Sequence, residues 1–124
     1  MGKRVVIVDD AEFMRHVLKE ILTENGFEVV GEAGGVEEAI ETVRETKPDI
    51  VTMDIMLPDG DGIMALRQIK EEMPEVTVVM ISALGQEDMV EEALGAGAYG
   101  FIVKPFKPSH VGDIMKRLNR EEEA

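Results

Sequence analysis

The 124-residue sequence contains no cysteine and no long apolar segment. The lack of cysteine excludes disulfide bonds and thiol chemistry, and it fits a reducing cytosol. No stretch approaches the ~18 consecutive apolar residues that a membrane span needs. The opening Met-Gly-Lys-Arg runs directly into an apolar strand pattern rather than into a signal peptide. These features predict a single-domain cytoplasmic protein without membrane contact.

Cationic side chains are also scarce, with 13 Lys and Arg against 26 Asp and Glu, for a formal net charge of −13. An electrostatic field of this sign repels phosphate backbones, so the composition argues against nucleic acid as a partner. A cationic protein surface or bound metal cations suit the charge better.

Five apolar, β-rich runs alternate with five helical patterns. The predicted strands are Arg4–Val8, Glu28–Gly31, Ile50–Met53, Val76–Ile81 and Gly100–Val103. These runs are continuous rather than alternating, which is typical of parallel strands covered on both faces. Between them, apolar residues recur at helical spacing, as in the stripe Phe13, Val17 and Ile21. A β-α unit repeated five times predicts an α/β fold with helices on both faces of a parallel sheet.

Charged and hydroxyl residues stand at the ends of four predicted strands. Asp9 and Asp10 follow the first strand, and Asp54 follows the third. Ser82 follows the fourth strand and Lys104 follows the fifth. In an open α/β sheet, ligands bind beyond the carboxyl ends of the strands. If these strands are neighbours, one edge of the sheet carries three carboxylates, a hydroxyl and an ammonium group.

Three carboxylates in one cleft repel each other, and burial increases the cost. A hard divalent cation such as Mg²⁺ removes that repulsion, because it prefers oxygen ligands. A carboxylate beside such a cation can attack a phosphoryl group, since this reaction needs mainly positioning and charge neutralisation. The set therefore predicts a phosphoryl-accepting site with Asp54 as the nucleophile, while Lys104 neutralises the new phosphate and Ser82 donates a hydrogen bond to it.

Each of these residues also has a simpler interpretation when it is taken alone. Asp10 could cap the helix that follows it, and Asp54 could be a turn residue before the Pro/Gly loop. Ser82 could be an ordinary loop hydroxyl and Lys104 a solvated surface charge. The prediction depends on their joint placement at strand ends.

Four motifs, VVIVDD, VTMDIMLPDGDG, VMISA and FIVKP, occur in this order along the chain. Together they resemble the receiver domains of two-component response regulators, over residues 3 to about 120. The resemblance implies a flavodoxin-like or CheY-like doubly wound fold, (βα)5, with the strand order 2-1-3-4-5. It also implies one receiver domain over residues 1–120, followed by an acidic tail over residues 121–124.

The resemblance implies a role for each matching residue. Asp54 corresponds to the phosphoacceptor. Asp9 and Asp10 correspond to the Mg²⁺-binding acids, with Asp10 the direct ligand and Asp9 acting partly through water. The backbone carbonyl of Met56 corresponds to a further ligand.

Other matching positions correspond to the groups that bind the phosphate and report it. Ser82 matches the switch hydroxyl, and the Ala83 N–H matches a group that contacts the phosphate. Lys104 matches the lysine that pairs with the phosphate. Phe101 stands where the family places its switch aromatic, and a cis peptide bond is expected before Pro105.

Two positions differ from the strongly hydrolytic members of the family. Met56 and Leu84 stand where those members carry polar side chains that help to orient water. Neither side chain can hold a water by a strong hydrogen bond, so slow self-dephosphorylation is expected. The resemblance implies a phosphoacceptor that assists only its own phosphorylation and dephosphorylation, and not an enzyme.

The stretches DDAEFMR, ISALGQEDMVEEAL and AGAYGFIVKPFKP resemble the CheY-type chemotaxis regulators most. This implies a stand-alone, monomeric regulator phosphorylated by a histidine kinase, here a chemotaxis kinase. Its downstream target would be a protein such as a flagellar motor switch or an adaptor. The target would contact the face formed by residues Gln86–Leu94, Tyr99–Val103 and Lys107–Lys116. A phosphorelay shuttle and the receiver of a longer transcription regulator are the alternatives.

Two other classes of protein share part of this pattern. A phosphatase of the haloacid dehalogenase type places its nucleophile after the first strand, in an Asp-x-Asp motif. Here the first strand ends in Asp9-Asp10-Ala11, and Asp54 follows the third. A flavin-binding module needs a hydroxyl- and Gly-rich phosphate loop after the first strand, and DDAEFMR is not such a loop.

Overall fold

The computed structural model describes the backbone of residues 2–123 and the side chains of residues 2–120. Along the chain the elements are β1 (Arg4–Val8), α1 (Glu12–Glu24), β2 (Glu28–Ala33), α2 (Val36–Thr46), β3 (Ile50–Asp54), β4 (Met56–Leu57), β5 (Gly60–Asp61), α3 (Gly62–Glu72), β6 (Thr77–Ala83), α4 (Glu87–Gly95), β7 (Gly100–Lys104) and α5 (Pro108–Glu123). Of the predicted acidic tail, Ala124 lies outside the described residues. None of the described helices is long and apolar enough to cross a membrane.

The central sheet has five parallel strands in the order β2-β1-β3-β6-β7. This is the predicted order 2-1-3-4-5, because β4 and β5 form a separate two-stranded antiparallel hairpin. The chain leaves β1 outward to β2 and then returns to the other side of β1 at β3. The carboxyl ends of β1 and β3 therefore meet where the winding direction reverses, which is where ligands bind in sheets of this type.

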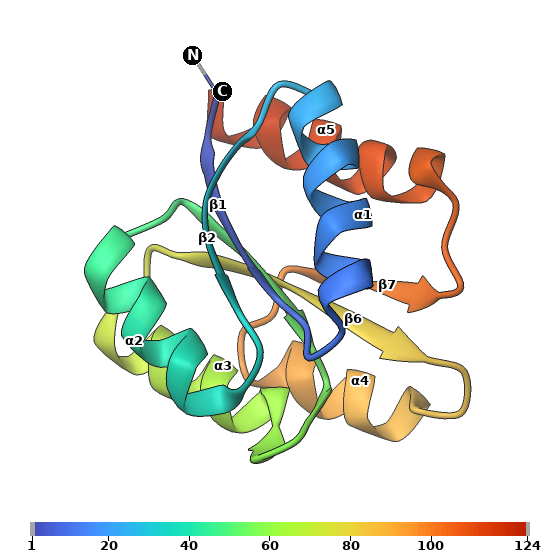
Figure 1. Ribbon diagram of the computed structural model, residues 1–124. Helices are drawn as coiled ribbons and strands as arrows, with labels where there is room; N and C mark the ends of the chain where they lie inside the picture. The colour runs from blue at the N-terminus through green and yellow to red at the C-terminus, as the bar shows by residue number, and fades with distance from the viewer. Residues whose placement is uncertain (1, 124) are drawn as a thin grey trace.

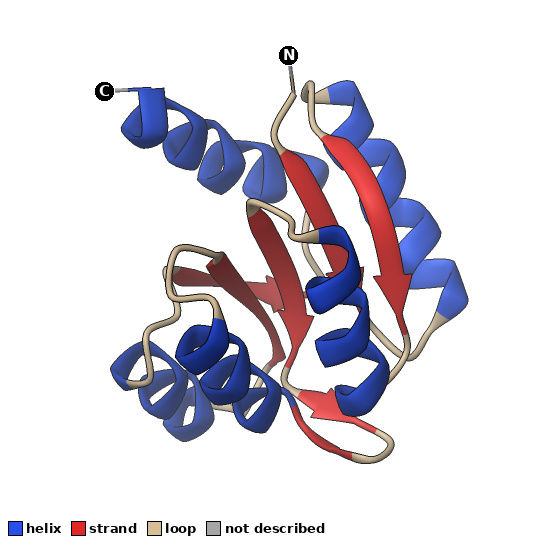
Figure 2. Ribbon diagram, turned by 90° about the vertical axis from the view of Figure 1, so that its left-hand side faces the viewer, coloured by secondary structure: helices blue, strands red, loops and turns tan. Residues whose placement is uncertain are grey.

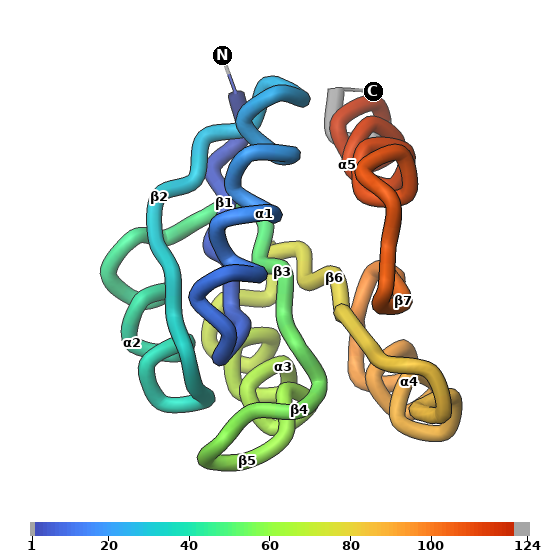
Figure 3. The backbone as a smooth tube through the Cα atoms, turned by 45° about the vertical axis from the view of Figure 1, so that its right-hand side comes forward, coloured from blue at the N-terminus to red at the C-terminus, as the bar shows by residue number. Residues whose placement is uncertain are grey.

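Helices cover both faces of the sheet (Figures 1 and 2). On one face, α1 and α5 pack with buried residues such as Leu18 and Met115 against Val5 and Ile7. On the other face, α2, α3 and α4 contribute buried residues that include Val43, Leu66 and Ala93. The tube in Figure 3 shows α1 and α5 side by side, on the side of the sheet opposite α2 and α3.

The predicted strands are all present, with differences at their ends. Strand β6 continues to Ala83, so Ser82 and Ala83 are its last two residues rather than loop residues. The hairpin β4–β5 was not predicted, and its turn is formed by the Pro58-Asp59 pair. The edge strand β2 is only partly buried, because one of its sides has no neighbouring strand.

The expectation that Phe13 belongs to the core stripe of the first helix is wrong. Phe13 lies in the first turn of α1 and is largely exposed. The buried stripe is instead formed by Leu18, Ile21 and Leu22, with Met14 partly buried beside them.

An ion pair joins the last turns of α2 and α3. Arg44 donates two hydrogen bonds to Glu72, Nε to Oε1 and Nη2 to Oε2, both at 2.8 Å. The hydrogen bond from Arg44, followed by one from Gln68, lowers the pKa of Glu72 from 4.5 to about 2. A carboxyl group whose pKa is lowered by folding stabilises the folded state only while it is ionised.

Acidification should therefore remove the contribution of this pair. This contribution to the stability of the fold is complete above pH 4.5, the ordinary pKa of the Glu72 carboxyl group. It is lost as the pH falls from there toward about 2. Urea denaturation across this range should show the stability difference between wild type and Glu72→Gln shrinking with acidification. Because the pair is solvent-exposed, the effect should be small and should weaken with added salt. Glu71→Gln, on the same helix, is the matched control, and an equal pH dependence in that variant would contradict the assignment.

Candidate functional site

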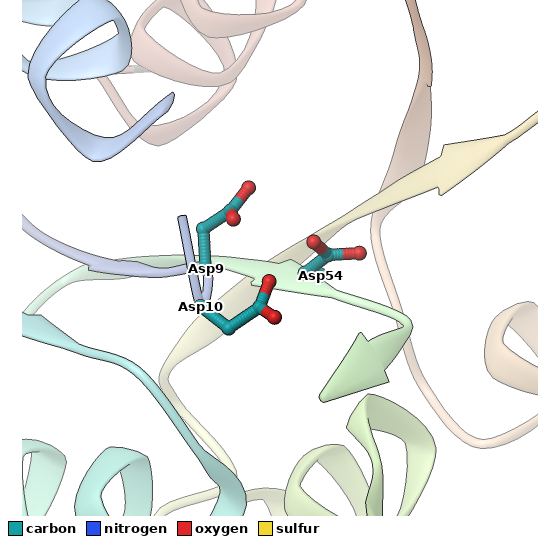
Figure 4. A group of neighbouring side chains, drawn as sticks. All are labelled: Asp9, Asp10 and Asp54. Atoms are coloured by element: carbon teal, nitrogen blue, oxygen red, sulfur yellow. The ribbon is translucent and has the colours of Figure 1, made fainter. Parts of the chain in front are cut away.

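Three aspartates gather at the carboxyl edge of the sheet, at the ends of β1 and β3 (Figure 4). The two strands are paired in parallel with Val8 opposite Met53, so the residues that follow come next to each other. Each of Asp9, Asp10 and Asp54 offers a carboxylate oxygen, and these oxygens all lie within 4.8 Å of one another. Asp9 is 1% exposed and Asp54 is 7% exposed, whereas Asp10 is exposed to solvent. The sequence-predicted acidic cluster is therefore present.

Lys104 reaches the two buried carboxylates from the end of β7. Its Nζ donates to Asp9 Oδ2 at 2.8 Å and to Asp54 Oδ2 at 2.9 Å. Lys104 is thus shared between two acids, and the cluster carries three potential negative charges against one positive charge. The peptide bond between Lys104 and Pro105 is cis, as predicted.

Burial and charge act in opposite directions on these groups. Burial raises the pKa of Asp54, and the hydrogen bond and charge of Lys104 offset this only in part. For Lys104, burial favours the neutral form, but hydrogen bonds to Asp9 and Asp54 outweigh it and raise its pKa. The ammonium group is therefore firmly charged, while Asp54 bears an uncompensated desolvation cost in the absence of a cation.

The donor set fits Mg²⁺. It offers carboxylate oxygens, which hard divalent cations prefer, and an excess of negative charge for the cation to neutralise. Asp10, on the solvent side, does not cap the following helix: Ala11 is the N-cap residue of α1, which has no side-chain cap. The Ala11 N–H instead donates to Asp9 Oδ1 at 2.9 Å. The helix-cap interpretation of Asp10 is therefore wrong, and its carboxylate is available to a metal.

Two residues that the sequence did not single out hold the site in shape. Arg15 Nη1 donates to the backbone carbonyl of Asp9 at 2.6 Å, and its Nε pairs with Glu32 of β2 at 3.2 Å. An arginine on a helix surface gives no signal of such a role. Gly62 donates to the carbonyl of Ile55 at 2.6 Å, and a Cβ there would collide with the carbonyl oxygen of Asp54. Its signal was present in the DGDG turn, because only glycine permits so close an approach.

The remaining predicted residues lie beside the acidic cluster or line a neighbouring cavity. The Met56 N–H donates to Asp54 Oδ1 over a long 3.4 Å, while the side chains of Met56 and Leu84 are exposed. Ser82 is buried at the end of β6. Ser82 and the exposed Phe101 line the same largely apolar cavity of about 230 Å³ between α4 and β7. The two predicted switch residues are thus adjacent to a space that either could enter.

A five-stranded parallel sheet with an acidic cluster at its switch point, paired to a lysine from the last strand, defines a class of phosphoacceptor signalling domains. The chain belongs to the response regulator receiver domain family, whose pattern matches residues 5–116. It is therefore the receiver of a CheY-like response regulator in a two-component system.

Individual relatives agree with this assignment. The chain is 52% identical to the chemotaxis protein CheY of Thermotoga maritima over 120 residues, which cover 97% of this chain and all of that protein. It is 51% identical to CheY of Bacillus subtilis over 120 residues, 96% of this chain and all of that one. It also resembles the structure of a CheX–CheY complex with beryllofluoride and magnesium from Borrelia burgdorferi, with a TM-score of 0.84, 39% identity and coverage of 94% of this chain and 86% of that one.

Proposed function

We propose that this protein is a stand-alone chemotaxis response regulator that accepts a phosphoryl group from a histidine kinase on Asp54. The observation that carries the proposal is the state of the Asp54 carboxylate. It is buried, it is paired to Lys104 through Oδ2, and it lies within reach of two further acids. Residues 1–120 act as one receiver unit in this proposal.

The hydrogen bonds distinguish Asp54 from Asp9 as the nucleophile. Both oxygens of Asp9 are engaged at short distance, Oδ1 by the Ala11 N–H and Oδ2 by Lys104. Within the part of the chain that the structure describes, Asp54 Oδ1 accepts only the long bond from the Met56 N–H. A carboxylate oxygen that accepts only a weak hydrogen bond is a better nucleophile than one that accepts a strong hydrogen bond. This supports attack by Asp54 Oδ1 on the phosphorus atom.

The other residues support the reaction through charge and hydrogen bonds. Asp9, Asp10, Asp54 and the carbonyl of Met56 would hold Mg²⁺, which when bound supplies charge neutralisation for phosphoryl transfer. Lys104 pairs with the new phosphate, and the Ser82 hydroxyl and Ala83 N–H donate hydrogen bonds to it. The phosphate adds roughly −1.5 to −2 charges at pH 7, which is the signal that the fold must transmit.

Transmission follows from the shared cavity of Ser82 and Phe101. Movement of Ser82 toward the phosphate leaves space that Phe101 can occupy, and this changes the face made by α4, β7 and α5. A chemotaxis kinase as donor and a flagellar motor switch or adaptor as target are proposed from the similarity to CheY proteins. The CheX–CheY complex is an example of a protein partner for a similar chain. The same similarity supports a monomer in the cytoplasm.

Intact-mass measurement tests the proposal directly. Wild-type protein incubated with Mg²⁺ and a small acyl phosphate should gain one phosphoryl group per chain, and chelation of the metal should prevent it. Continuous turnover of a generic phosphate ester with no stable adduct would instead indicate a phosphatase and contradict the proposal.

The lifetime of the phosphoryl group should depend on Met56. Met56→Asn places an amide beside the site, where it can hold a water by a hydrogen bond. One such bond formed in the transition state should speed hydrolysis about tenfold. Decay of the adduct by mass or ³²P release measures this. Met64→Asn is the matched control, because Met64 and Met56 are both 57% exposed. Wild-type decay within seconds would refute the expectation of a slow intrinsic rate.

A further inference from the structure

The last backbone N–H of β6 has an unexpected partner. The Ala83 N–H donates to the side-chain Oε1 of Gln86 at 2.6 Å. Gln86 is three residues further along the chain, directly before α4, and its side chain folds back over the turn. Gly85 makes this turn possible, with a φ of +91°. The turn lies beyond the tip of the β6 arrow in Figure 1.

The direction of this N–H follows from strand geometry. The Ile81 carbonyl accepts from the Ile55 N–H at 3.0 Å, so the peptide groups of Ile81 face β3. Along a strand every second residue faces the same side, and Ala83 therefore also directs its N–H toward β3. The next carbonyl on that side belongs to Ile55, however, and it accepts from the Gly62 N–H at 2.6 Å instead. The Ala83 N–H thus faces the space beside Asp54, and the Gln86 carboxamide satisfies it there.

We propose that Gln86 is a competing acceptor: in the unphosphorylated protein its carboxamide holds the Ala83 N–H, and it gives up this donor when a phosphoryl oxygen arrives on Asp54. This inference rests on the proposed function, because it needs the phosphoryl group at Asp54. No additional donor is required, since one hydrogen bond is exchanged for another.

The exchange has a consequence at the surface. Release of the carboxamide frees the Gln86 side chain at the start of α4, the helix that opens the proposed partner-binding face. Gln86 thereby sets the affinity of the site for a phosphoryl group and also links that site to α4. Its role differs from that of Ser82 and Phe101, because Gln86 acts through the Ala83 N–H and those two residues act through the cavity that they line between α4 and β7.

Three variants test this inference with two measurements. The first measurement is hydrogen exchange of the Ala83 amide by NMR without ligand, and the second is affinity for beryllofluoride in the presence of Mg²⁺. Gln86→Ala should speed Ala83 exchange and tighten beryllofluoride binding roughly 2–10-fold, because a net hydrogen bond of ordinary strength no longer competes. Gln86→Glu keeps an acceptor of the same length and adds a negative charge, so Ala83 should stay protected and binding should weaken. Gln68→Ala, a glutamine on α3, should change neither.

The outcomes separate this inference from the proposed function. Unchanged Ala83 exchange in Gln86→Ala, or unchanged or weaker beryllofluoride binding in that variant, would overturn the role of Gln86 and leave the phosphoacceptor assignment standing. Absence of beryllofluoride binding by folded wild-type protein would overturn the phosphoacceptor assignment, and the inference with it.

Discussion

Asp54→Asn is expected to abolish the phosphoryl adduct completely. The carboxamide oxygen is a poor nucleophile and carries no charge to share with a metal, so the attacking group and one ligand are lost together. Intact mass after incubation with Mg²⁺ and an acyl phosphate measures the loss. Asp113→Asn replaces an exposed acid on α5 and should leave the adduct unchanged. An adduct that persists in Asp54→Asn would show that another residue is the acceptor.

The same variant should also change stability, in opposite directions with and without metal. Burial raises the pKa of Asp54, so the ionised carboxylate is less favourable in the folded chain than in the unfolded chain. At neutral pH without metal, Asp54→Asn should therefore be at least as stable as wild type in urea. Mg²⁺ should stabilise the wild type more than the variant, because a ligand that binds only the folded state adds stability according to its affinity. A strongly destabilised metal-free variant would contradict this.

Lys104→Met is expected to have the largest effect on the metal-free fold. The methionine fills similar volume but leaves the buried carboxylates of Asp9 and Asp54 without a counter-ion. Loss of one partner of a buried ion pair typically costs about 3–5 kcal/mol. Since the Lys104 side chain is 24% exposed and solvent screens part of the interaction, a loss of about 2–3 kcal/mol in the free energy of unfolding is expected.

Magnesium should reverse part of this loss. Without the ammonium group the cluster carries more uncompensated negative charge, and Lys104→Met should bind Mg²⁺ more tightly than wild type. Phosphorylation should nevertheless slow, because no cation remains to pair with the new phosphate. Urea denaturation with and without Mg²⁺ separates these effects, and Lys107→Met, which removes an exposed lysine nearby, is the control. Equal metal-free stability of Lys104→Met and Lys107→Met would contradict the assigned role of the shared ion pair.

Much of the fold could be predicted because its elements are encoded locally. The run Arg4–Val8 forms β1 with the predicted bounds, since the four consecutive apolar residues after Arg4 are suited to burial on both faces and leave little choice of structure. The left-handed residue Gly26 and the helix start at Pro108 also follow from local backbone chemistry. The strand order came from the resemblance of the motifs to a family, because periodicity alone does not determine which strands become neighbours.

The identity of the acidic residues was likewise available in the sequence. An apolar strand that ends in Asp9 and Asp10 shows that two carboxylates stand at the edge of a buried sheet, whatever the neighbours are. That these acids meet Asp54 depends on β1 and β3 pairing in register. Local sequence does not specify such pairing, since it is decided by the packing of helices on both faces.

Contacts between side chains were decided by the tertiary structure alone. Lys104 bridges Asp9 and Asp54 although it lies 95 and 50 residues away from them in sequence. Arg15 donates to the carbonyl of Asp9 and pairs with Glu32 of β2. Sequence determined which chemical groups stand at each strand end. Distances of about 3 Å decide which of them bond, and these arise only when the whole sheet has assembled.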